Sequence, residues 1–348
     1  MSWPTWLPLR DSLRPMSPYG APQVPARASL NTNENPYSPS PALQKAIADA
    51  VAQVASDLNR YPDRDATVLR TKLADYINEQ SGTKFSADNV WAANGSNEII
   101  QSIFLAFAQG PVLGFTPSYS MHPLIAKVTG SQWIDGKRNI DFSLNAAEAV
   151  SEIQKHKPTL TFITTPNNPT GGAVSIETIQ MLADAAKSVG GLLVVDEAYA
   201  EFSQEISAVT LISNSPHVVV IRTMSKAFAF AGARVGYLVS DVSVKDAMMI
   251  VRLPYHLSAL TQAAAQVAID HRAELLGGVS TLIKARAHVV QALHDMGLTT
   301  IPSSANFVLF TGFKQDAPQL WASMLEKGVL IRDVGLSGYL RVTIGNEA

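Results

Sequence analysis

Residues 222–237 read RTMSKAFAFAGARVGY and follow an apolar, β-branched run that is typical of a buried strand. Lys226 is therefore expected on the loop just beyond the end of that strand. The hydroxyls of Thr223 and Ser225 flank it and Arg234 follows, an arrangement suited to binding a phosphate beside the amine. A lysine that forms a Schiff base with an aldehyde cofactor, whose phosphate is held by hydroxyls and an arginine, needs these residue types close together. The alternative is a surface lysine in a loop rich in serine and threonine.

The composition limits the classes of protein to consider. With 348 residues, 47% hydrophobic and 16% charged, the chain can bury a large core and is expected to form two lobes. A net charge of −2 without a long basic run argues against nucleic acid as a partner. The absence of cysteine excludes disulfides and thiolate metal sites and fits a cytoplasmic protein. No apolar run reaches the ~18 residues of a membrane span, no signal-peptide core is present, and the histidines form no metal-binding pattern.

The pattern of the sequence divides the chain into three parts. Residues 1–40 are rich in proline and asparagine and predict an arm that crosses another part of the protein and is not a self-sufficient element. Residues 41–255 predict a large domain that binds the cofactor, and residues 256–348 a smaller α+β domain. Strand and helix patterns alternate over residues 90–240, which predicts an α/β fold with a mostly parallel sheet and helices on both faces.

Polar residues follow the strands of the predicted sheet. Asn168 lies in the turn TPNNPTGG, whose prolines and glycines fix its amide at a strand end. Asp196 ends a fully apolar strand, where a carboxylate is costly unless a cation or a hydrogen-bond donor meets it. It could hold a pyridinium N–H, with Tyr199 reaching the ring hydroxyl, or it could be a helix N-cap. Because such sheets bind ligands at the carboxyl ends of their strands, we expect Asn168, Asp196 and Lys226 to share one crevice.

Further candidate ligand-binding residues lie beside other strands. Ser96 and Asn97 begin a helix after a glycine turn, which predicts an anion site made by backbone N–H groups, or else a simple capped helix start. Tyr119 follows a strand and could stack on a flat ring or belong to the core. Arg332 and Arg341 lie at or beside strands near the C-terminus. They suit a carboxylate or phosphate ligand, or they are exposed arginines on an edge strand.

From about Tyr19 to Gly345, the order of these motifs closely resembles histidinol-phosphate aminotransferases, within the aspartate-aminotransferase family of fold type I enzymes that depend on pyridoxal 5'-phosphate. The resemblance implies that Lys226 binds the cofactor covalently and moves a proton between substrate and cofactor. Tyr61 would reach the cofactor phosphate from the other chain of a homodimer, and the arm of residues 1–40 would join the small domain and the dimer partner. The other implied cofactor contacts are Asp196 at the pyridine nitrogen, Asn168 and Tyr199 at the phenolic oxygen, Tyr119 on the ring, and Ser96, Asn97, Thr223, Ser225 and Arg234 at the phosphate.

The resemblance also implies a reaction: transamination of L-histidinol phosphate with 2-oxoglutarate to imidazole-acetol phosphate and L-glutamate, in histidine biosynthesis. Arg332 and Arg341 would bind the substrate phosphate, with Tyr19 contributed by the partner chain. From its spacing alone, Tyr19 could instead be a packing aromatic in an extended arm. The chain departs from the family in two places. It lacks the usual final helix, which suggests a truncated C-terminus, and His256 stands where many relatives carry asparagine, which is expected to alter the substrate side of the pocket.

Three other functions remain open from the sequence. An aromatic-amino-acid (phenylalanine) aminotransferase on the same fold would use the arginines to bind a carboxylate. A threonine-phosphate decarboxylase would release carbon dioxide without depending on a keto acid. A cofactor-binding regulator would need a DNA-binding segment, and no helix-turn-helix with a basic face is evident in the sequence.

Overall fold

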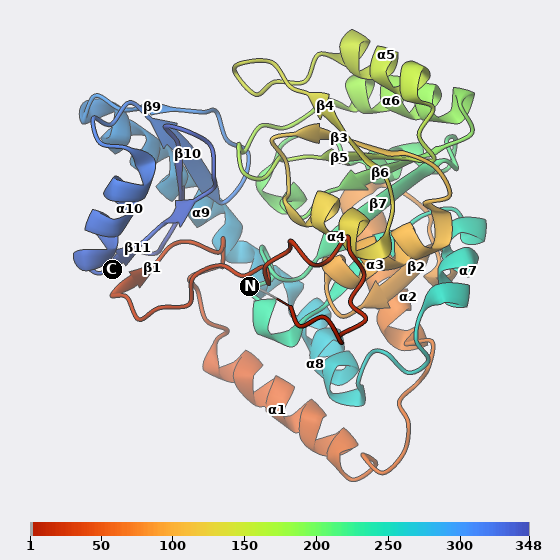
Figure 1. The fold of residues 1–348 in the computed structure, drawn as a ribbon. Helices are drawn as coiled ribbons and strands as arrows, with labels where there is room; N and C mark the ends of the chain where they lie inside the picture. The colour runs from red at the N-terminus through yellow and green to blue at the C-terminus, as the bar shows by residue number, and fades with distance from the viewer. Residues whose placement is uncertain (1–2, 348) are drawn as a thin grey trace.

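The computed structural model describes residues 3–347 and contains a seven-stranded sheet in the order β2-β8-β7-β6-β5-β3-β4 (Figure 1). Residues 1–2 of the arm and residue 348 at the end of the chain lie outside the described part. Strands β3 to β7 pair in parallel, whereas β8 is antiparallel to both of its neighbours. The predicted α/β fold with a mostly parallel sheet is confirmed. The strands are β2 (Val90–Ala93), β3 (Val112–Thr116), β4 (Trp133–Lys137), β5 (Leu160–Thr164), β6 (Leu192–Asp196), β7 (Val218–Thr223) and β8 (Gly236–Val239).

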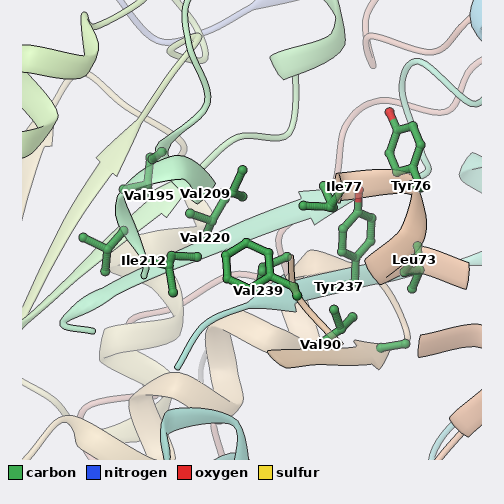
Figure 2. Packing of buried hydrophobic residues seen from close by; sticks show 14 of the residues in the cluster. Leu73, Tyr76, Ile77, Val90, Val195, Val209, Ile212, Val220, Tyr237 and Val239 are labelled. Atoms are coloured by element: carbon green, nitrogen blue, oxygen red, sulfur yellow. The ribbon is translucent and has the colours of Figure 1, made fainter. Parts of the chain in front are cut away.

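Helices cover both faces of this sheet, because alternate residues of each buried strand point to opposite sides. On β6, Val195 packs in the hydrophobic cluster that includes α2, while the adjacent Val194 packs in the cluster that includes α3. Figure 2 shows the first cluster, with Leu73 and Ile77 of α2 beside Tyr237 of β8. The helices are α1 (Pro41–Ala55), α2 (Thr67–Ser81), α3 (Ser96–Phe107), α4 (Met121–Thr129), α5 (Ala146–His156), α6 (Ile176–Ser188), α7 (Val242–Val251), α8 (Ala259–Asp270), α9 (Arg272–Asp295) and α10 (Ala317–Glu326).

A second, antiparallel sheet forms the small domain, in the order β12-β13-β10-β9. Its strands are β9 (Thr299–Thr300), β10 (Phe307–Thr311), β12 (Arg332–Asp333) and β13 (Leu340–Thr343). The arm contributes a short strand, β1 (Ala28–Ser29), that pairs in parallel with β11 (Val329–Leu330), and Figure 1 shows the arm passing from there to the large domain. The arm therefore joins the small domain to the large domain of its own chain.

Several predicted element bounds differ from the observed ones. The sequence pattern predicts a strand from Arg234 to Val239, but the observed β8 begins at Gly236, because Arg234 adopts a left-handed backbone with φ of 56°. The sequence also predicts two long helices, about Ser258 to Leu276 and Val279 to Met296. The observed helices there are α8 and α9, which meet at His271 instead. Because α8 packs against α1 and α2, it belongs structurally with the large domain, although it follows residue 255.

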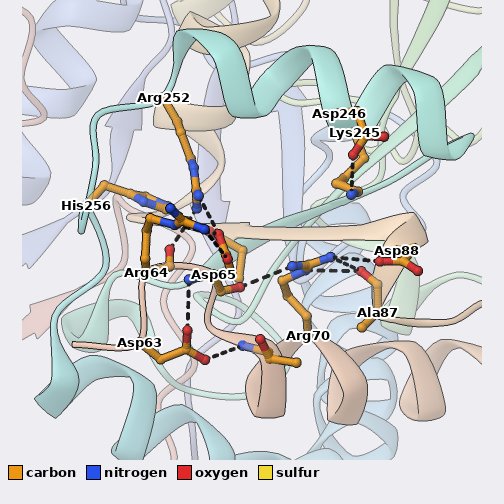
Figure 3. Close-up of polar contacts among 12 residues, drawn as sticks. Asp63, Arg64, Asp65, Arg70, Ala87, Asp88, Lys245, Asp246, Arg252 and His256 are labelled. Carbon is orange, nitrogen blue, oxygen red and sulfur yellow. Dashed lines mark hydrogen bonds and ion pairs between the residues drawn. The ribbon is translucent and has the colours of Figure 1, made fainter.

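A network of charged residues fixes the loop that follows α1 to the end of α7 (Figure 3). Hydrogen bonds from Arg64 and Arg252 lower the pKa of Asp65 to about 2, although burial opposes them. Arg70 is buried and donates to the backbone carbonyls of Ala87 and Val90. The cations in this network are thus paired within the chain, and we assign the network a structural role.

Two kinds of feature are absent from residues 3–347. No helix there is long and apolar enough to cross a membrane. No cluster of three or more histidine, aspartate or glutamate side chains there could hold a metal ion.

Candidate active site

A cavity of about 600 Å³ opens at the carboxyl ends of the central strands, between the large domain, the small domain and the arm. Segments far apart in the sequence line it, which explains how one site can combine so many of the predicted residues. Those found in its lining are Tyr19, Ser96, Asn97, Tyr119, Asn168, Asp196, Tyr199, Thr223, Ser225, Lys226, Arg234, Arg332 and Arg341.

Lys226 follows β7, and its amine faces the arm. Nζ donates a hydrogen bond of 2.8 Å to the carbonyl oxygen of Thr32. Burial, reinforced by the positive charge of Arg341, lowers the pKa of Lys226 to about 8. A substantial fraction of this amine is therefore neutral near pH 8, as a nucleophile toward an aldehyde must be.

One end of the cavity has the donors that a phosphate requires. The α3 helix begins at Ser96, so its backbone N–H groups and dipole are directed at this end. The hydroxyls of Thr223 and Ser225 lie 3.0 Å apart, and Arg234 Nη1 donates to Ser225 Oγ at 3.4 Å. Since none of these groups is a carboxylate, they suit a phosphate.

Close backbone contacts hold this end of the cavity together. A Cβ added to Gly95 would lie 2.5 Å from Arg234 Nη2, and Gly95 has a positive φ of 85°. A Cβ on Gly236 would lie 2.5 Å from the backbone nitrogen of Ser96. Both glycines are therefore required for the strand, turn and helix to meet around the phosphate position.

Asp196 lies at the bottom of the cavity as the last residue of β6, and only 2% of it is exposed. Its Oδ2 is 3.2 Å from Nε2 of His122, and its Oδ1 accepts from the backbone N–H of Ala198 at 3.2 Å. Two donors therefore support a buried carboxylate that can bind a ring N–H. His122 was not among the residues predicted from the sequence. The only hint in the sequence is that His122 lies three residues after the candidate Tyr119.

Hydroxyl and amide groups surround the middle of the cavity. Tyr119 donates from its hydroxyl to Asn97 Oδ1 at 3.1 Å, and burial raises the pKa of Tyr119 above its ordinary value. The hydroxyl oxygen of Tyr199 accepts from Asn168 Nδ2 at 3.5 Å and from Asn33 Nδ2 at 2.8 Å. The sequence predicted Asn168 and Tyr199 in this crevice but did not identify Asn33.

The other end of the cavity carries two arginines from the small domain. Arg332 and Arg341 are opposite each other in register on β12 and β13, so their positive charges are close together. Arg341 is buried, lies over the ring of Phe307 at 5.0 Å, and donates to Asn168 Oδ1 and to the carbonyl of Asn31. Burial lowers the pKa of Arg341 to about 10. A dianionic ligand here would stabilise both charges.

Two expectations about tyrosines have different outcomes. Tyr19 was expected to come from a partner chain, but it lines the cavity of its own chain, where its hydroxyl accepts from Ser120 Oγ at 3.3 Å. The arm folds back across α4, and this returns Tyr19 to its own site. Tyr61 is 79% exposed, stacks on Tyr255 at 4.4 Å and lies outside the described lining of this cavity.

His256 also lies outside the described lining, contrary to the expectation that it would shape the substrate side. Its Nε2 is 2.9 Å from the carbonyl oxygen of Ala92, and its own carbonyl accepts from Asn94 at 2.8 Å. His256 therefore supports the turn that precedes α3.

Comparisons with known proteins agree with this geometry. Residues 28–348 match the family described as "Aminotransferase class I and II". Histidinol-phosphate aminotransferase from Mycolicibacterium vanbaalenii is 56% identical over 344 residues, covering 97% of this chain and 92% of the relative. The enzyme of that name from Mycobacterium sp. strain JLS is 53% identical, with coverages of 97% and 90%.

Solved structures show the same fold. Histidinol-phosphate aminotransferase from Sinorhizobium meliloti, in complex with pyridoxal-5'-phosphate, aligns with a TM-score of 0.82 at 24% identity and covers 93% of this chain and 88% of its own. The enzyme from Clostridium acetobutylicum also gives a TM-score of 0.82, at 23% identity, with coverages of 92% and 95%. With its lysine, strand-end aspartate and the start of α3 in one cavity, the chain belongs to the class I and II aminotransferase family.

Proposed function

We propose that the chain transfers the amino group of L-histidinol phosphate to 2-oxoglutarate, giving imidazole-acetol phosphate and L-glutamate in histidine biosynthesis. The single observation that carries the proposal is one cavity lined by Lys226, by the donors at the start of α3 and after β7, and by the two arginines of the small domain. One end suits the phosphate of pyridoxal 5'-phosphate, and the other suits a phosphate on the substrate. Relatives that are 52–56% identical over nearly the whole chain are named histidinol-phosphate aminotransferase, which supports the choice of substrate.

The cofactor supplies a protonated ring that withdraws electrons from the carbon atom where the substrate loses a proton. Lys226 would hold the cofactor aldehyde through Nζ until the substrate's amino group replaces it there. The freed amine would then take the proton from the substrate's α-carbon. Its lowered pKa, near 8, matches this task because a general base works best when its pKa is near the operating pH.

The remaining large-domain residues orient the cofactor and balance its charge. Asp196, supported by His122, would hold the proton on the ring nitrogen. Asn168 and Tyr199 would donate to the oxygen on the ring, and Tyr119 would lie against its face. Ser96, Asn97, Thr223, Ser225 and Arg234 would bind the phosphate.

Arg332 and Arg341 would bind the substrate phosphate, with Tyr19 beside them. A phosphate offers more acceptor oxygens and more charge than the carboxylate of an aromatic amino acid. The paired arginines therefore favour a phosphorylated substrate over the alternative of a phenylalanine aminotransferase. Threonine phosphate would satisfy the same arginines, so the test must include decarboxylation.

We further propose a cytoplasmic homodimer in which Tyr61 of each chain reaches the cofactor phosphate of the other. Its support is that Tyr61 is 79% exposed and stacked on Tyr255 outside its own cavity. In this assembly, residues 41–255 form most of the cofactor-binding domain and residues 256–348 most of the small domain.

The proposed function is tested with purified protein loaded with pyridoxal 5'-phosphate. We expect visible absorbance from the bound cofactor that bleaches when L-histidinol phosphate is added, and turnover that requires 2-oxoglutarate. Borohydride reduction followed by peptide mapping should label Lys226. Preferential turnover of phenylalanine, or carbon dioxide release from threonine phosphate, would replace the proposed reaction with the corresponding alternative.

A Lys226→Ala variant should lose the label and the visible absorbance, and its turnover should fall by about 10²-fold to 10⁴-fold. Lys45→Ala is the matched control, because Lys45 is an exposed lysine of α1 that pairs with Asp49. Retention of transamination in Lys226→Ala would contradict the central assignment.

A further inference from the structure

Asn33 lies in the arm, is 1% exposed, and contacts Tyr199, 166 residues later in the chain. We propose that Asn33 is a positioning residue: it holds the Tyr199 hydroxyl so that the hydroxyl proton is directed into the cavity, and Thr343 fixes the orientation of its amide. The inference rests on the proposed function only in that the cavity binds pyridoxal 5'-phosphate.

The hydrogen bonds at Tyr199 determine where its proton can go. A tyrosine hydroxyl has a single proton to donate, while its oxygen can accept. Nδ2 of Asn33 donates to this oxygen at 2.8 Å, and Nδ2 of Asn168 donates at 3.5 Å. Amide N–H groups cannot accept, so neither contact uses the proton. The proton therefore remains available for a negatively charged oxygen in the cavity that Tyr199 lines.

Thr343 of β13 determines which end of the Asn33 amide faces Tyr199. Its hydroxyl donates to Asn33 Oδ1 at 3.0 Å, and the same hydroxyl oxygen accepts from the backbone N–H of Asn33 at 3.0 Å. Because Oδ1 is held by Thr343, Nδ2 is the end left for Tyr199. Asn306 Nδ2 also donates to the Asn33 carbonyl at 3.1 Å, so the small domain holds both the side chain and the backbone.

The backbone at this position also favours asparagine. Asn33 has a φ of 56°, in the left-handed region where asparagine is among the few side chains commonly found. Glycine adopts the same conformation without strain. Asn33→Gly therefore removes the amide while keeping the backbone, which Asn33→Ala would not do.

The position of the Tyr199 proton has a measurable consequence. A hydroxyl that donates to the cofactor's ring oxygen stabilises negative charge there. A second donor on the hydroxyl strengthens that donation. Loss of the Asn33 amide should therefore let the ring oxygen hold the proton that it shares with the lysine nitrogen more tightly. The pH midpoint of the cofactor's visible absorbance should then rise.

Other charged and titratable groups face Tyr199 and are kept in every variant. They are Arg341 on β13, Asp196 on β6, Tyr19 in the arm and Lys226, whose Nζ is 6.0 Å from the ring centroid. A shift of the midpoint in a variant at Asn33 or Thr343 can thus be assigned to the hydrogen bonds that the substitution removes.

The experiment titrates the visible absorbance of the cofactor-loaded protein against pH in the absence of substrate. We expect the midpoint of Asn33→Gly to rise by about half a pH unit to one unit, the size expected from loss of one hydrogen bond. Thr343→Val should shift the midpoint in the same direction. Thr343→Ser keeps the hydroxyl and should restore the wild-type midpoint.

Arg10→Ala is the control for general loosening of the arm, because Arg10 donates to the carbonyl oxygen of Val128 in α4 and lies outside the described lining of the cavity. Its melting temperature should fall while its absorbance midpoint stays that of the wild type. An unchanged midpoint in Asn33→Gly would overturn the inference. If Asn33→Gly does not fold, identical midpoints in Thr343→Val and Thr343→Ser would overturn it equally.

The inference and the proposed function fail in different ways. A wild-type protein that binds the cofactor but does not turn over L-histidinol phosphate contradicts the proposed function and leaves the titration interpretable. A wild-type enzyme with the expected turnover, together with an unshifted Asn33→Gly midpoint, contradicts only the role of Asn33.

Discussion

Lys226 is the residue on which the proposed chemistry depends, and its environment predicts a pH effect on stability in the cofactor-free protein. Burial lowers its pKa from 10.5 to about 8, so the folded state binds this proton less tightly than the unfolded chain does. Below pH 8, Lys226 is protonated in both the folded and the unfolded state, so the folded state carries the full free-energy cost of burying the charged amine. Between pH 8 and 10.5 only the unfolded state is protonated, so this cost disappears as the pH rises.

A Lys226→Met variant should therefore unfold at higher denaturant concentration than the wild type at pH 7, with both proteins free of cofactor. The difference in unfolding free energy should shrink between pH 8 and pH 10. Gly277→Ala, which introduces no titrating group, is the control whose difference should stay constant. A difference for Lys226→Met that is the same at every pH would contradict the proposed environment of the amine.

Arg332 gives a prediction about substrate choice. Arg332→Gln should raise the KM for L-histidinol phosphate at least ~10-fold, because a charge-assisted hydrogen bond to phosphate is lost. The KM of Arg332→Lys should lie between those of the wild type and Arg332→Gln, since lysine keeps the charge but not the planar, two-pronged set of donors. L-Histidinol, which lacks the phosphate, should be turned over poorly by the wild type, and Arg332→Gln should turn it over no more slowly than the wild type does. An equal loss with both compounds would show that Arg332 does not bind the phosphate.

At the scale of elements, the proposed phosphate site depends on how closely β8 approaches the start of α3. Gly236→Ala places a Cβ 2.5 Å from Ser96 N and 2.6 Å from Gly95 C, and both are backbone atoms that cannot rotate away. We expect α3 to shift, the dissociation constant for pyridoxal 5'-phosphate to rise by about tenfold or more, and stability to fall by about 1–3 kcal/mol.

Fluorescence titration of the cofactor-free variant with pyridoxal 5'-phosphate measures this effect. Gly277→Ala in α9 is the matched control, because no atom lies within 4 Å of its added Cβ. That control should be neutral or slightly stabilising, by up to about 1 kcal/mol. Unaltered cofactor affinity in Gly236→Ala would mean that the α3 terminus does not bind the phosphate.

At the scale of the whole molecule, the proposed exchange of Tyr61 between chains predicts complementation. Lys226→Ala and Tyr61→Ala are each expected to be poorly active as homodimers. After equal mixing and reassortment, about half of the dimers are mixed, and each mixed dimer has one site with both residues intact. Activity should recover to about a quarter of the wild-type value. Activity that stays at the mean of the two variants would contradict shared sites.

Much of the large domain could be predicted from the sequence. The buried strands read as apolar, β-branched runs, and each change to a polar residue marks a strand end. Asn168, Asp196 and Lys226 could therefore be placed in one crevice, and the structure brings them together. Element bounds were less accurate, because local conformations such as the left-handed backbone of Arg234 do not alter the hydrophobic period.

Contacts between distant segments could not be predicted in this way. The pairing of His122 with Asp196 and of Asn33 with Tyr199 joins residues 74 and 166 positions apart. The return of Tyr19 to its own cavity depends on the path of the arm across α4. Hydrophobic periodicity tells which face of an element is buried but not which neighbour covers it.

The sequence by itself determined the parallel sheet, the lysine after a strand, the acid at a strand end and the helix start at Ser96, because each follows from a local pattern of residues. Only the tertiary structure decided how the arm and the small domain complete the site. Their side chains reach it through hydrogen bonds whose partners depend on how the domains pack, and a one-dimensional pattern does not contain that packing.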